Sequence, residues 1–504
     1  MAELLDLEGA VRTVLRLEPA AEQEWTRLGV FNQYMRGDHV KPFTPRYATD
    51  EYKALQDRAI TNLIPLVVRG VTQRLYVDGH KANPSDDEQS SAWVHWQGNQ
   101  MDMRQKALYE AGGIFGYAWC SVMPIAGTPL GQTSDPIIRP RSPLSWYGEF
   151  DDETEDVWPR FVLRSRGPRR TLVDAFATYN LRVRETKGGG TRLDADLSDP
   201  VDPESWYVEH EVLVDGERVC PFRYVPVDVT LTGRPQGDVE QAKAVQDRLN
   251  QTVFDLLLAQ TYSSTKVRYM TGMVPPGTDQ GGADEYEPDE PDEPRTPQQI
   301  ADEVARRAMA TGRAPLELYH DKILLLESTD AKVGTLDESN LEQLVLAVAN
   351  CLRIFGLASQ TPPHDLLGEM VNVSAEGLIA AESSRGFKVG DRKTIIGEAL
   401  EDVLRAAAGI AGDAAGATAQ AAQLIWRDTD PQSFAATVDG LGKLALMLDV
   451  PVRWLWSKIP GVTQTDIRAL EAAAEAEGPV EAARRRLERQ AVGTDGEIDG
   501  TAAA

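Results

Sequence analysis

The residues of this chain that most often carry out catalysis or bind metal ions are few and widely spaced. Three cysteines, Cys120, Cys220 and Cys351, form neither a CxxC pair nor a disulfide framework, which is typical of a protein that folds in a reducing compartment. No two histidines have the spacing of a metal-binding motif. We therefore expect each histidine at the surface or hydrogen-bonded in the core. The histidines are His39, His80, His95, His210, His320 and His364.

The common catalytic motifs that can be recognised from spacing are absent from the sequence. There is no GxxxxGK(S/T) loop to hold the phosphates of a nucleotide, no GxSxG nucleophile turn and no HExxH zinc motif. Carboxylates are abundant, but no pair stands out as a general acid and general base. The sequence therefore predicts a structural or binding protein without catalytic residues, metal or cofactor.

One alternative is a hydrolase whose site follows none of these motifs. Trp119, Cys120 and His210 are the candidates, in the β-rich part of the chain. Cys120 lies in the apolar run AWCSVM, which favours a buried thiol over a nucleophile, because burial disfavours the reactive thiolate.

Length and composition indicate a folded protein of several domains. The chain has 504 residues, of which 42% are hydrophobic. That is enough for roughly two to four domains with sizeable cores. The first residues are acidic where a signal peptide would be basic, and no apolar run approaches the length of a membrane span. We therefore expect neither a secretory signal nor a membrane partner, and a cytoplasmic site of folding.

The charge balance argues against tight binding to nucleic acid over the whole surface. The chain has 52 basic and 78 acidic residues, for a formal charge of −26. A protein that neutralises many phosphates usually shows the opposite balance. The simplest explanation is solubility. A second explanation is that an acidic surface allows DNA to pass without binding to it.

Helices are predicted on both sides of residue 80. A helix capped by Thr49 would place Tyr52, Leu55, Ala59 and Leu63 on one face.

A second helix is predicted from about residue 87, with Trp93, Trp96, Met103 and Leu108 as core candidates. From residue 114 to 232 the chain consists of short β-rich segments, and VDGERV at 214–219 is typical of a hairpin.

The second half is dominated by long amphipathic helices. Two are predicted at 236–264 and 336–356, separated by short strands and by the acidic, proline-rich loop 284–294. A polar loop with paired prolines follows, and then a helix over 374–409 that would be about 50 Å long. The sequence thus predicts an α+β fold that is mainly helical.

This order of elements resembles the portal proteins of long-tailed bacteriophages. The local sequences LEQLVLAVANCLRIFGLASQTPPHDLLGEMVNVSAEGLIAAESS and IWRDTDPQSFAATVDGLGKLAL are also similar to that family. The resemblance extends from about residue 25 to about residue 475. No single motif is diagnostic, so the ordered set of segments carries the assignment.

The resemblance implies the portal fold, with wing, stem, clip and crown regions that assemble as a ring. Carried over by position, the regions are the wing at 1–235, the first stem helix at 236–264, the clip at 265–335, the second stem helix at 336–356, the tunnel loop at 357–373, the long wing helix at 374–409, the crown at 410–478 and a flexible tail at 479–504.

The resemblance also implies a function and a set of partners. Portal proteins form rings of about twelve copies at one capsid vertex. Such a ring passes double-stranded DNA without sequence specificity during packaging and ejection. Its other partners are a terminase motor, a head-completion adaptor, and the major capsid and scaffolding proteins. The protein would be assembled in the host cytoplasm and located in the virion. The alternative within this class is a virion or scaffold protein that forms no channel.

Three groups of residues are candidate sites under this interpretation. The tunnel loop would project inward, with the prolines limiting its freedom; the alternative is a surface connection between two helices. The stem acids would face the lumen or pair with basic residues of neighbouring subunits, and the clip acids would form a solvated loop or serve in docking. The DNA-facing candidates of the tunnel loop are Ser359, Gln360, Thr361, Pro362, Pro363 and His364. The candidate acids of the stem lumen are Asp238, Glu240, Asp247 and Asp255. The candidate docking residues of the clip are Asp284, Glu285, Glu287, Asp289 and Glu290.

Overall fold

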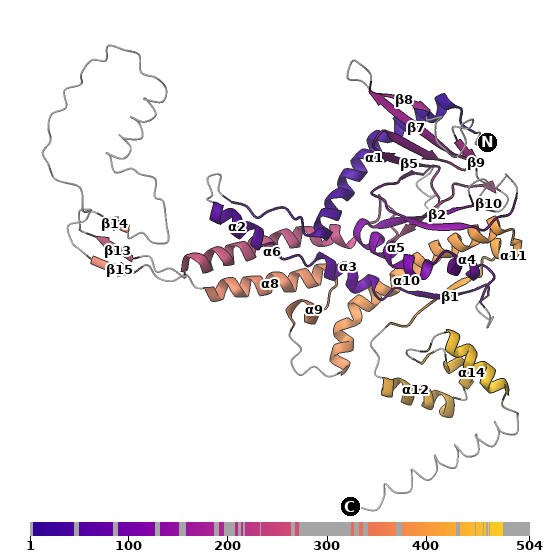
Figure 1. The fold of residues 1–504 in the computed structure, drawn as a ribbon. Helices are drawn as coiled ribbons and strands as arrows, with labels where there is room; N and C mark the ends of the chain where they lie inside the picture. Colours follow the sequence, from indigo (N-terminus) through magenta and orange to yellow (C-terminus); the bar gives the residue numbers. More distant parts are fainter. Residues whose placement is uncertain are drawn as a thin grey trace, which may run out of the picture. The chain divides into compact units, whose positions relative to one another are not determined.

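A computed structural model describes most of the chain, in two compact units (Figure 1). One unit comprises residues 1–39, 62–246 and 353–504, and the other comprises residues 40–61 and 247–352. We call them the first and the second unit. The residues that the structure describes are 4–44, 50–83, 89–125, 132–150, 158–185, 191–195, 207–209, 213–214, 217–231, 233–263, 268–271, 324–326, 332–335, 341–368, 375–429, 434–448, 450–456, 458–459, 462 and 464–476.

The fold is α+β and mainly helical, as predicted. Two long helices, α6 (Asp238–Ser263) and α8 (Leu341–Ser359), have residues in both units, and α2 (Asp50–Arg58) belongs to the second unit. The helices of the first unit are α1 (Leu7–Arg36), α3 (Ile64–Thr72), α4 (Trp93–Gly98), α5 (Met101–Phe115), α9 (Pro363–Leu367), α10 (Ala375–Ala411), α11 (Ala414–Ala417), α12 (Phe434–Met447), α13 (Val452–Trp456) and α14 (Gln464–Ala476).

The strands of the first unit form four sheets among the described residues. The largest has the order β4-β5-β6-β7-β8, with β9 also paired to β7, and all of its pairings are antiparallel. The others are β12-β2-β3, β10-β11 and β1-β16. The strands are β1 (Val77–Lys81), β2 (Tyr117–Met123), β3 (Ile137–Arg141), β4 (Tyr147–Glu149), β5 (Phe161–Arg166), β6 (Arg169–Val173), β7 (Ala177–Glu185), β8 (Thr191–Ala195), β9 (Tyr207–Glu209), β10 (Leu213–Val214), β11 (Glu217–Arg218), β12 (Phe222–Pro226) and β16 (Gln423–Trp426).

Helix α1 covers one face of the largest sheet (Figure 1). The helix begins after Asp6, whose side chain accepts a hydrogen bond from the Gly9 amide at 2.7 Å, and it ends at Gly37 with φ of 94°. Its inner residues recur every three or four positions, which places them on one helical face. The packed side chains are Ala10, Val14, Leu17 and Ala21 from α1 and Leu163, Leu172, Tyr179 and Leu181 from β5, β6 and β7.

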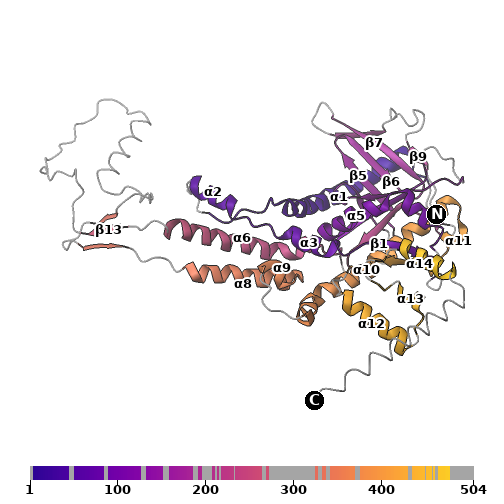
Figure 2. The same cartoon turned by 60° about the horizontal axis from the view of Figure 1, so that its bottom comes forward.

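The long helix α10 completes a second core in the first unit. Its apolar side chains pack with those of α4, α5, β2, β3 and β12. The buried residues on α10 follow helical spacing and include Val389, Ile396, Leu400, Val403 and Leu404. The core of residues before 230 is therefore completed by a helix that starts at residue 375. Figure 2 shows α10 and β1 from a second direction.

Two glycines allow the end of α5 to meet the start of α6. Gly116 has φ of 90°, and a Cβ there would lie 2.2 Å from the carbonyl oxygen of Pro235. A Cβ on Gly237 would lie 2.5 Å from the carbonyl oxygen of Ile114. Only glycine tolerates the close approach at both positions, and at Gly116 it also tolerates the left-handed backbone conformation, so these positions fix where α6 begins.

Two segments were each predicted as one continuous helix, and this was wrong: each consists of two helices. The predicted helix after Thr49 stops at Arg58, and a new helix, α3, begins at Ile64. Pro65 explains the break, because its ring would clash with the preceding turn of a continuous helix. The predicted helix from about residue 87 is likewise split into α4 and α5 by Gln100, whose φ is 56°.

The second of these breaks changes which side chains are buried. Trp96 and Leu108 are buried as predicted, and Trp93 packs partly buried against the same core. Met103, predicted in the core, is 69% exposed, and Met101 is buried instead. The left-handed residue Gln100 shifts the helical phase, so the spacing counted from the tryptophans no longer applies.

The second unit contains α2, parts of α6 and α8, and a small sheet. The sheet has the order β14-β13-β15, from β13 (Arg268–Thr271), β14 (Leu324–Leu326) and β15 (Lys332–Thr335). Polar side chains of α6 bind the 40–61 segment: Asn250 accepts from the Thr61 amide at 3.2 Å and Gln251 from the Phe43 amide at 2.8 Å. Residues 40–61, assigned by resemblance to the wing, thus cluster with stem and clip segments.

Candidate functional site

The first residue of α6, Asp238, lies in a buried ion-pair cluster with α10. Its carboxylate accepts hydrogen bonds from both terminal nitrogens of Arg392, at 2.7 and 2.8 Å, and lies 2.7 Å from Lys388 Nζ. Burial raises the pKa of Asp238, but Arg392 and Lys388 together outweigh burial and hold this pKa below its ordinary value. The carboxylate is therefore an anion bound by two cations of one helix.

A second cluster ties the short helix α9 to α10. Arg385 on α10 donates to Asp365 of α9 at 2.5 Å and also binds Glu382 on its own helix. Glu382 accepts a further hydrogen bond from Arg74, at 2.8 Å, and lies 3.0 Å from His364 Nε2. Burial raises the pKa of Glu382, but the surrounding cations lower it below its ordinary value.

The second cluster has the donor atoms of a metal site, but its charges are already balanced. One ligand atom each from His364, Asp365 and Glu382 lies within 4.8 Å of the others. Both carboxylates, however, accept hydrogen bonds from guanidinium groups of Arg74 or Arg385. A divalent cation would have to displace these groups. The cluster is therefore best described as an ion-pair network that positions α9.

Two of the predicted DNA-facing residues turn inward within this chain. Ser359 and Thr361 are 3% and 7% exposed. The Ser359 hydroxyl donates to the carbonyl oxygen of Phe355 at 2.7 Å and lies 2.9 Å from the Thr361 hydroxyl. Since their hydroxyl groups already have partners and little exposure, the expectation that these two residues contact DNA is not supported by their positions.

The remaining tunnel-loop candidates differ in exposure. Gln360 and Pro363 are exposed, His364 is half-buried in the ion-pair network, and Pro362 is buried. Gln360 has φ of 55°, so the chain turns sharply at this residue. The expected open loop instead contains the helical residues 357–359 of α8 and the helix α9. Residues 369–373 lie outside the described residues.

The four predicted stem acids have different environments. Asp238 is 2% exposed and bound by Lys388 and Arg392, so the prediction that it faces a lumen is wrong. Glu240 lies 3.0 Å from Arg27 on α1. Asp247 is half-buried, and Asp255 is exposed.

The predicted clip acids cannot be placed. Asp284, Glu285, Glu287, Asp289 and Glu290 lie outside the described residues, as does the tail from residue 479.

The residues of the alternative hydrolase site do not form a catalytic arrangement among the described residues. Trp119 and Cys120 are 1% and 0% exposed, which confirms the prediction of a buried thiol. Burial raises the pKa of Cys120 to about 12, although Arg141 and Arg223 act in the opposite direction. His210 lies outside the described residues.

Three other histidines lie as predicted, two in the core and one partly exposed. His39 and His80 are 6% and 2% exposed. His39 Nε2 lies 3.0 Å from the Tyr34 carbonyl oxygen, and His80 Nδ1 lies 2.5 Å from the Ser90 hydroxyl. His95 is half-buried. His320 lies outside the described residues.

Helix α8 is apolar but exposes much of its apolar surface. Val345 and Leu346 are 52% and 59% exposed, and Leu357 is 81% exposed. By length and composition, α8 is the one helix in the described part of the chain that could cross a membrane. This differs from the expectation that no segment would qualify. The other explanation for such a helix is a protein partner that covers the exposed side chains.

Sequence reasoning missed the two ion-pair clusters that position this region. Glu382 and Arg385 are three residues apart on a helix, a spacing that indicates a local pair. Nothing in the sequence connects Asp238 with Arg392, which lie 154 residues apart along the chain.

The chain matches a family model described as phage portal protein, SPP1 Gp6-like, over residues 16–480. Among solved structures it is similar to a chain in the virion of a native gene transfer agent (GTA) particle, with 13% identity, 81% of this chain and 96% of that chain covered, and a TM-score of 0.41. It is also similar to a chain in the neck of a native GTA particle computed with C12 symmetry, with 13% identity, 84% and 94% covered, and a TM-score of 0.35. No curated protein matches the chain.

Proposed function

This chain belongs to the SPP1 Gp6-like family of phage portal proteins, and from that premise we propose that about twelve copies close into a ring around a DNA channel. The ring occupies one vertex of a capsid and is part of the virion. It passes double-stranded DNA without sequence specificity during packaging and ejection. The terminase motor docks on it during packaging, and a head-completion adaptor binds it afterwards. The capsid and scaffolding proteins are its other partners, and assembly takes place in the host cytoplasm.

The observation that carries this proposal is the exposed apolar surface of α8. Side chains such as Val345 and Leu346 lose their contact with water when a neighbouring copy covers them. If no neighbouring copy covered it, such an apolar helix would promote disordered association, even on a chain whose net charge of −26 opposes association. A closed ring covers the same surface on every copy.

Within the ring, we assign the regions as the resemblance implies. The wing is residues 1–235 together with the helix 374–409, the stem is 236–264 and 336–356, and the clip is 265–335. The crown is 410–478, followed by the tail from 479. The clip acids from Asp284 to Glu290 serve in docking the motor or the adaptor. This assignment is supported by family membership and by the positions of α6, α8 and α10 along the chain.

For the tunnel loop, we narrow the DNA-facing candidates to its exposed residues. Gln360 and Pro363 present their side chains to solvent, whereas Ser359 and Thr361 are buried. Among the stem acids, Glu240, Asp247 and Asp255 remain candidates for the lumen. An electronegative wall keeps the duplex mobile because it forms no phosphate contacts that hold DNA in place.

Imaging of the purified full-length protein tests the ring. Negative-stain class averages should show a closed particle with a central hole, and native mass spectrometry should give about twelve subunits. A stable monomer at micromolar concentration contradicts the proposal. A closed particle without a hole favours the second candidate, a virion or scaffold protein without a channel.

Catalysis is not part of the proposed function. The family is structural, and the described thiol of the alternative hydrolase site is buried, with a pKa raised to about 12. A thiolate would be rare at neutral pH in such a site.

A further inference from the structure

One face of the largest sheet is strongly basic, in a protein that is acidic overall. Residues two apart on a strand point to the same face, and residues in register on neighbouring strands share that face. Arg164 and Arg166 on β5 therefore share a face with Arg169 on β6 and with Arg182 and Arg184 on β7. We call these five arginines the basic sheet face.

Three of these arginines form a row across three strands. Arg166 is in register with Arg169, and Arg169 is in register with Arg182. Like charges directly opposite one another on neighbouring strands destabilise a sheet. The row continues to Asp194 on β8. Three cations in register on neighbouring strands make this part of the sheet a region of positive potential, which attracts an anionic partner.

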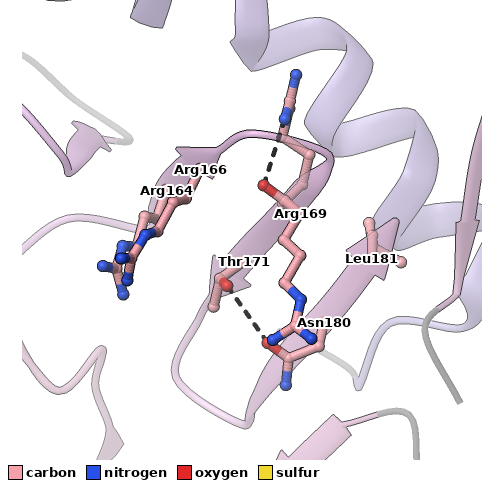
Figure 3. Close-up of a pocket in the computed structure, with 7 residues that line it drawn as sticks. Arg164, Arg166, Arg169, Thr171, Asn180 and Leu181 are labelled. Atoms are coloured by element: carbon pink, nitrogen blue, oxygen red, sulfur yellow. Dashed lines mark hydrogen bonds between the residues drawn. The ribbon is translucent and has the colours of Figure 1, made fainter. Parts of the chain in front are cut away.

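A cavity of about 210 Å³ lies at this face, and Figure 3 shows the side chains around it. Arg164 and Arg166 lie side by side, and Arg169 extends along the sheet towards Asn180. The Thr171 hydroxyl lies 3.3 Å from Asn180 Oδ1, which closes the floor of the cavity with neutral polar groups. The cavity is thus surrounded by guanidinium groups.

The two faces of the sheet differ in what covers them. On the face that α1 covers, Arg170 lies 2.5 Å from Glu18 of that helix. On the basic sheet face, the Arg164 guanidinium lies over the Trp146 ring, 5.2 Å from its centroid, and this ring limits the freedom of the arginine. Arg164 also lies close enough to Arg141 to contribute, after burial, to lowering its pKa.

We propose that the basic sheet face binds the phosphate backbone of double-stranded DNA. All five cations are arginines, whose planar forks bind phosphate oxygens in pairs. Arginines two residues apart on a strand are separated by about 7 Å, so several of them can reach successive phosphates. The contact requires no base recognition and is therefore independent of sequence. None of the five arginines is among the proposed channel residues, and binding of a duplex to this face does not require ring closure.

The composition of the face favours DNA over an acidic protein. A stable protein interface needs a buried apolar or aromatic centre. Val162 and Val173 on this face are buried in the core. The other described side chains of the basic sheet face are arginine, threonine and asparagine. No exposed large hydrophobic residue lies between residues 158 and 185 of the described part. The Trp146 ring next to Arg164 is buried, so no described aromatic side chain of this face can stack on a base, and the duplex is favoured over a single strand.

The experiment measures binding of the full-length protein to a fluorescently labelled duplex of about 25 base pairs, by anisotropy, from 50 to 200 mM salt. The test variant carries Arg166→Ser, Arg169→Ser and Arg182→Ser. The control variant carries Arg12→Ser, Arg36→Ser and Arg58→Ser, three exposed arginines of α1 and α2 whose loss changes the net charge equally. Both must show the same oligomeric state as the wild type.

We expect the test variant to bind on the order of 100-fold more weakly at 50 mM salt, with the slope of log affinity against log salt reduced by about 3. The control should bind like the wild type. Melting curves of both variants should be close to that of the wild type, because all six replaced arginines are exposed, and this excludes unfolding as the cause of weaker binding. Equal binding by the two variants would overturn the proposal. So would a wild type that binds polyglutamate but not the duplex, because the partner would then be an acidic protein.

A further variant tests whether the chain occupies this face itself. The segment DDETED at 151–156 is acidic and precedes β5 in the sequence. If the duplex binds only after these acids are replaced by serine, the face is an internal contact and the proposal is wrong. A wild type that binds the duplex with this segment intact supports it.

Discussion

Asp238, the first residue of α6, is bound through both carboxylate oxygens by Arg392, which lies 154 residues later on α10. Both side chains are almost fully buried, at 0% and 6% exposure. A charge pair in such a place is costly to break, because the remaining partner has neither water nor a counter-ion. The pair therefore fixes the start of α6 to α10 in the first unit.

Replacing Asp238 should destabilise the first unit strongly. Asp238→Asn leaves Arg392 and Lys388 buried without their anion, so we expect a loss of about 3–5 kcal/mol in the free energy of unfolding. Urea unfolding followed by tryptophan fluorescence measures the change. The matched control is Asp255→Asn, at an exposed position of the same helix, and it should lie within about 0.5 kcal/mol of the wild type. Equal stability of the two variants would contradict the buried pair.

The buried histidine of β1 predicts a loss of stability in mild acid. Burial, followed by the charge of Arg405, lowers the pKa of His80 to about 4. In the unfolded chain His80 takes up a proton near pH 6.5, whereas in the folded protein it stays neutral until about pH 4. The free energy of unfolding therefore does not depend on His80 above pH 6.5, and it decreases as the pH falls towards 4. At pH 5 the loss is about 2 kcal/mol relative to pH 7. In His80→Gln, the difference between the unfolding free energies at pH 7 and pH 5 should be about 2 kcal/mol smaller than in the wild type. The same pH dependence as the wild type would refute the prediction.

The described cysteines should react slowly in the folded protein. Cys120 and Cys220 are buried, and burial raises the pKa of each to about 12. Cys351 is 9% exposed. Iodoacetamide at pH 8 should therefore label all three only after unfolding, as measured by intact mass spectrometry. Rapid labelling of Cys120 in the folded state would revive the hydrolase alternative.

The exposed face of α8 predicts a variant that folds but does not assemble. Leu346 is 59% exposed, so Leu346→Lys should leave the stability of the single chain within about 0.5 kcal/mol while it places a charge in the subunit contact. Sedimentation should then show monomers in place of rings. Leu15→Lys, at a 56% exposed position of α1, is the matched control and should still assemble. If Leu346→Lys forms normal rings, α8 does not carry the subunit contact.

Two substitutions of the exposed turn residue Gln360 test separately whether it shapes the turn and whether it faces DNA. Its positive φ is costly for a residue with a side chain, so Gln360→Gly should stabilise the turn by about 1 kcal/mol. Gln360→Arg should leave folding unchanged and slow DNA packaging in an in vitro assay, because the added cations bind phosphates. Ser383→Arg adds the same charge at an exposed position of α10 and serves as the control. Unchanged packaging by Gln360→Arg would place the turn away from the DNA.

Features with a local cause could be predicted from the sequence. The periodicity of α6, α8 and α10 identified three long helices, and the hairpin predicted at 214–219 is confirmed by the pairing of β10 with β11. The burial of Cys120 followed from the apolar run around it. In each case a few neighbouring residues determine the outcome.

Features that depend on distant residues could not be predicted in this way. The row Arg166, Arg169 and Arg182 exists only through the register of three strands, which no short segment specifies. The burial of Asp238 depends on Arg392 and Lys388, so its helical position alone suggested a lumen acid. Likewise, polar loop composition at 359–365 concealed α9, which is anchored by Arg385 on the following helix.

The pairing of β1 with β16 has a consequence for biosynthesis. Val77 of β1 is in register with Trp426, and the core behind it includes α10. A nascent chain therefore cannot finish the first unit until more than four-fifths of its length has left the ribosome, and contacts of such long sequence separation form slowly. During that interval the early strands stay open to wrong partners, which makes this polypeptide a natural client for chaperones and a poor candidate for expression as an N-terminal fragment.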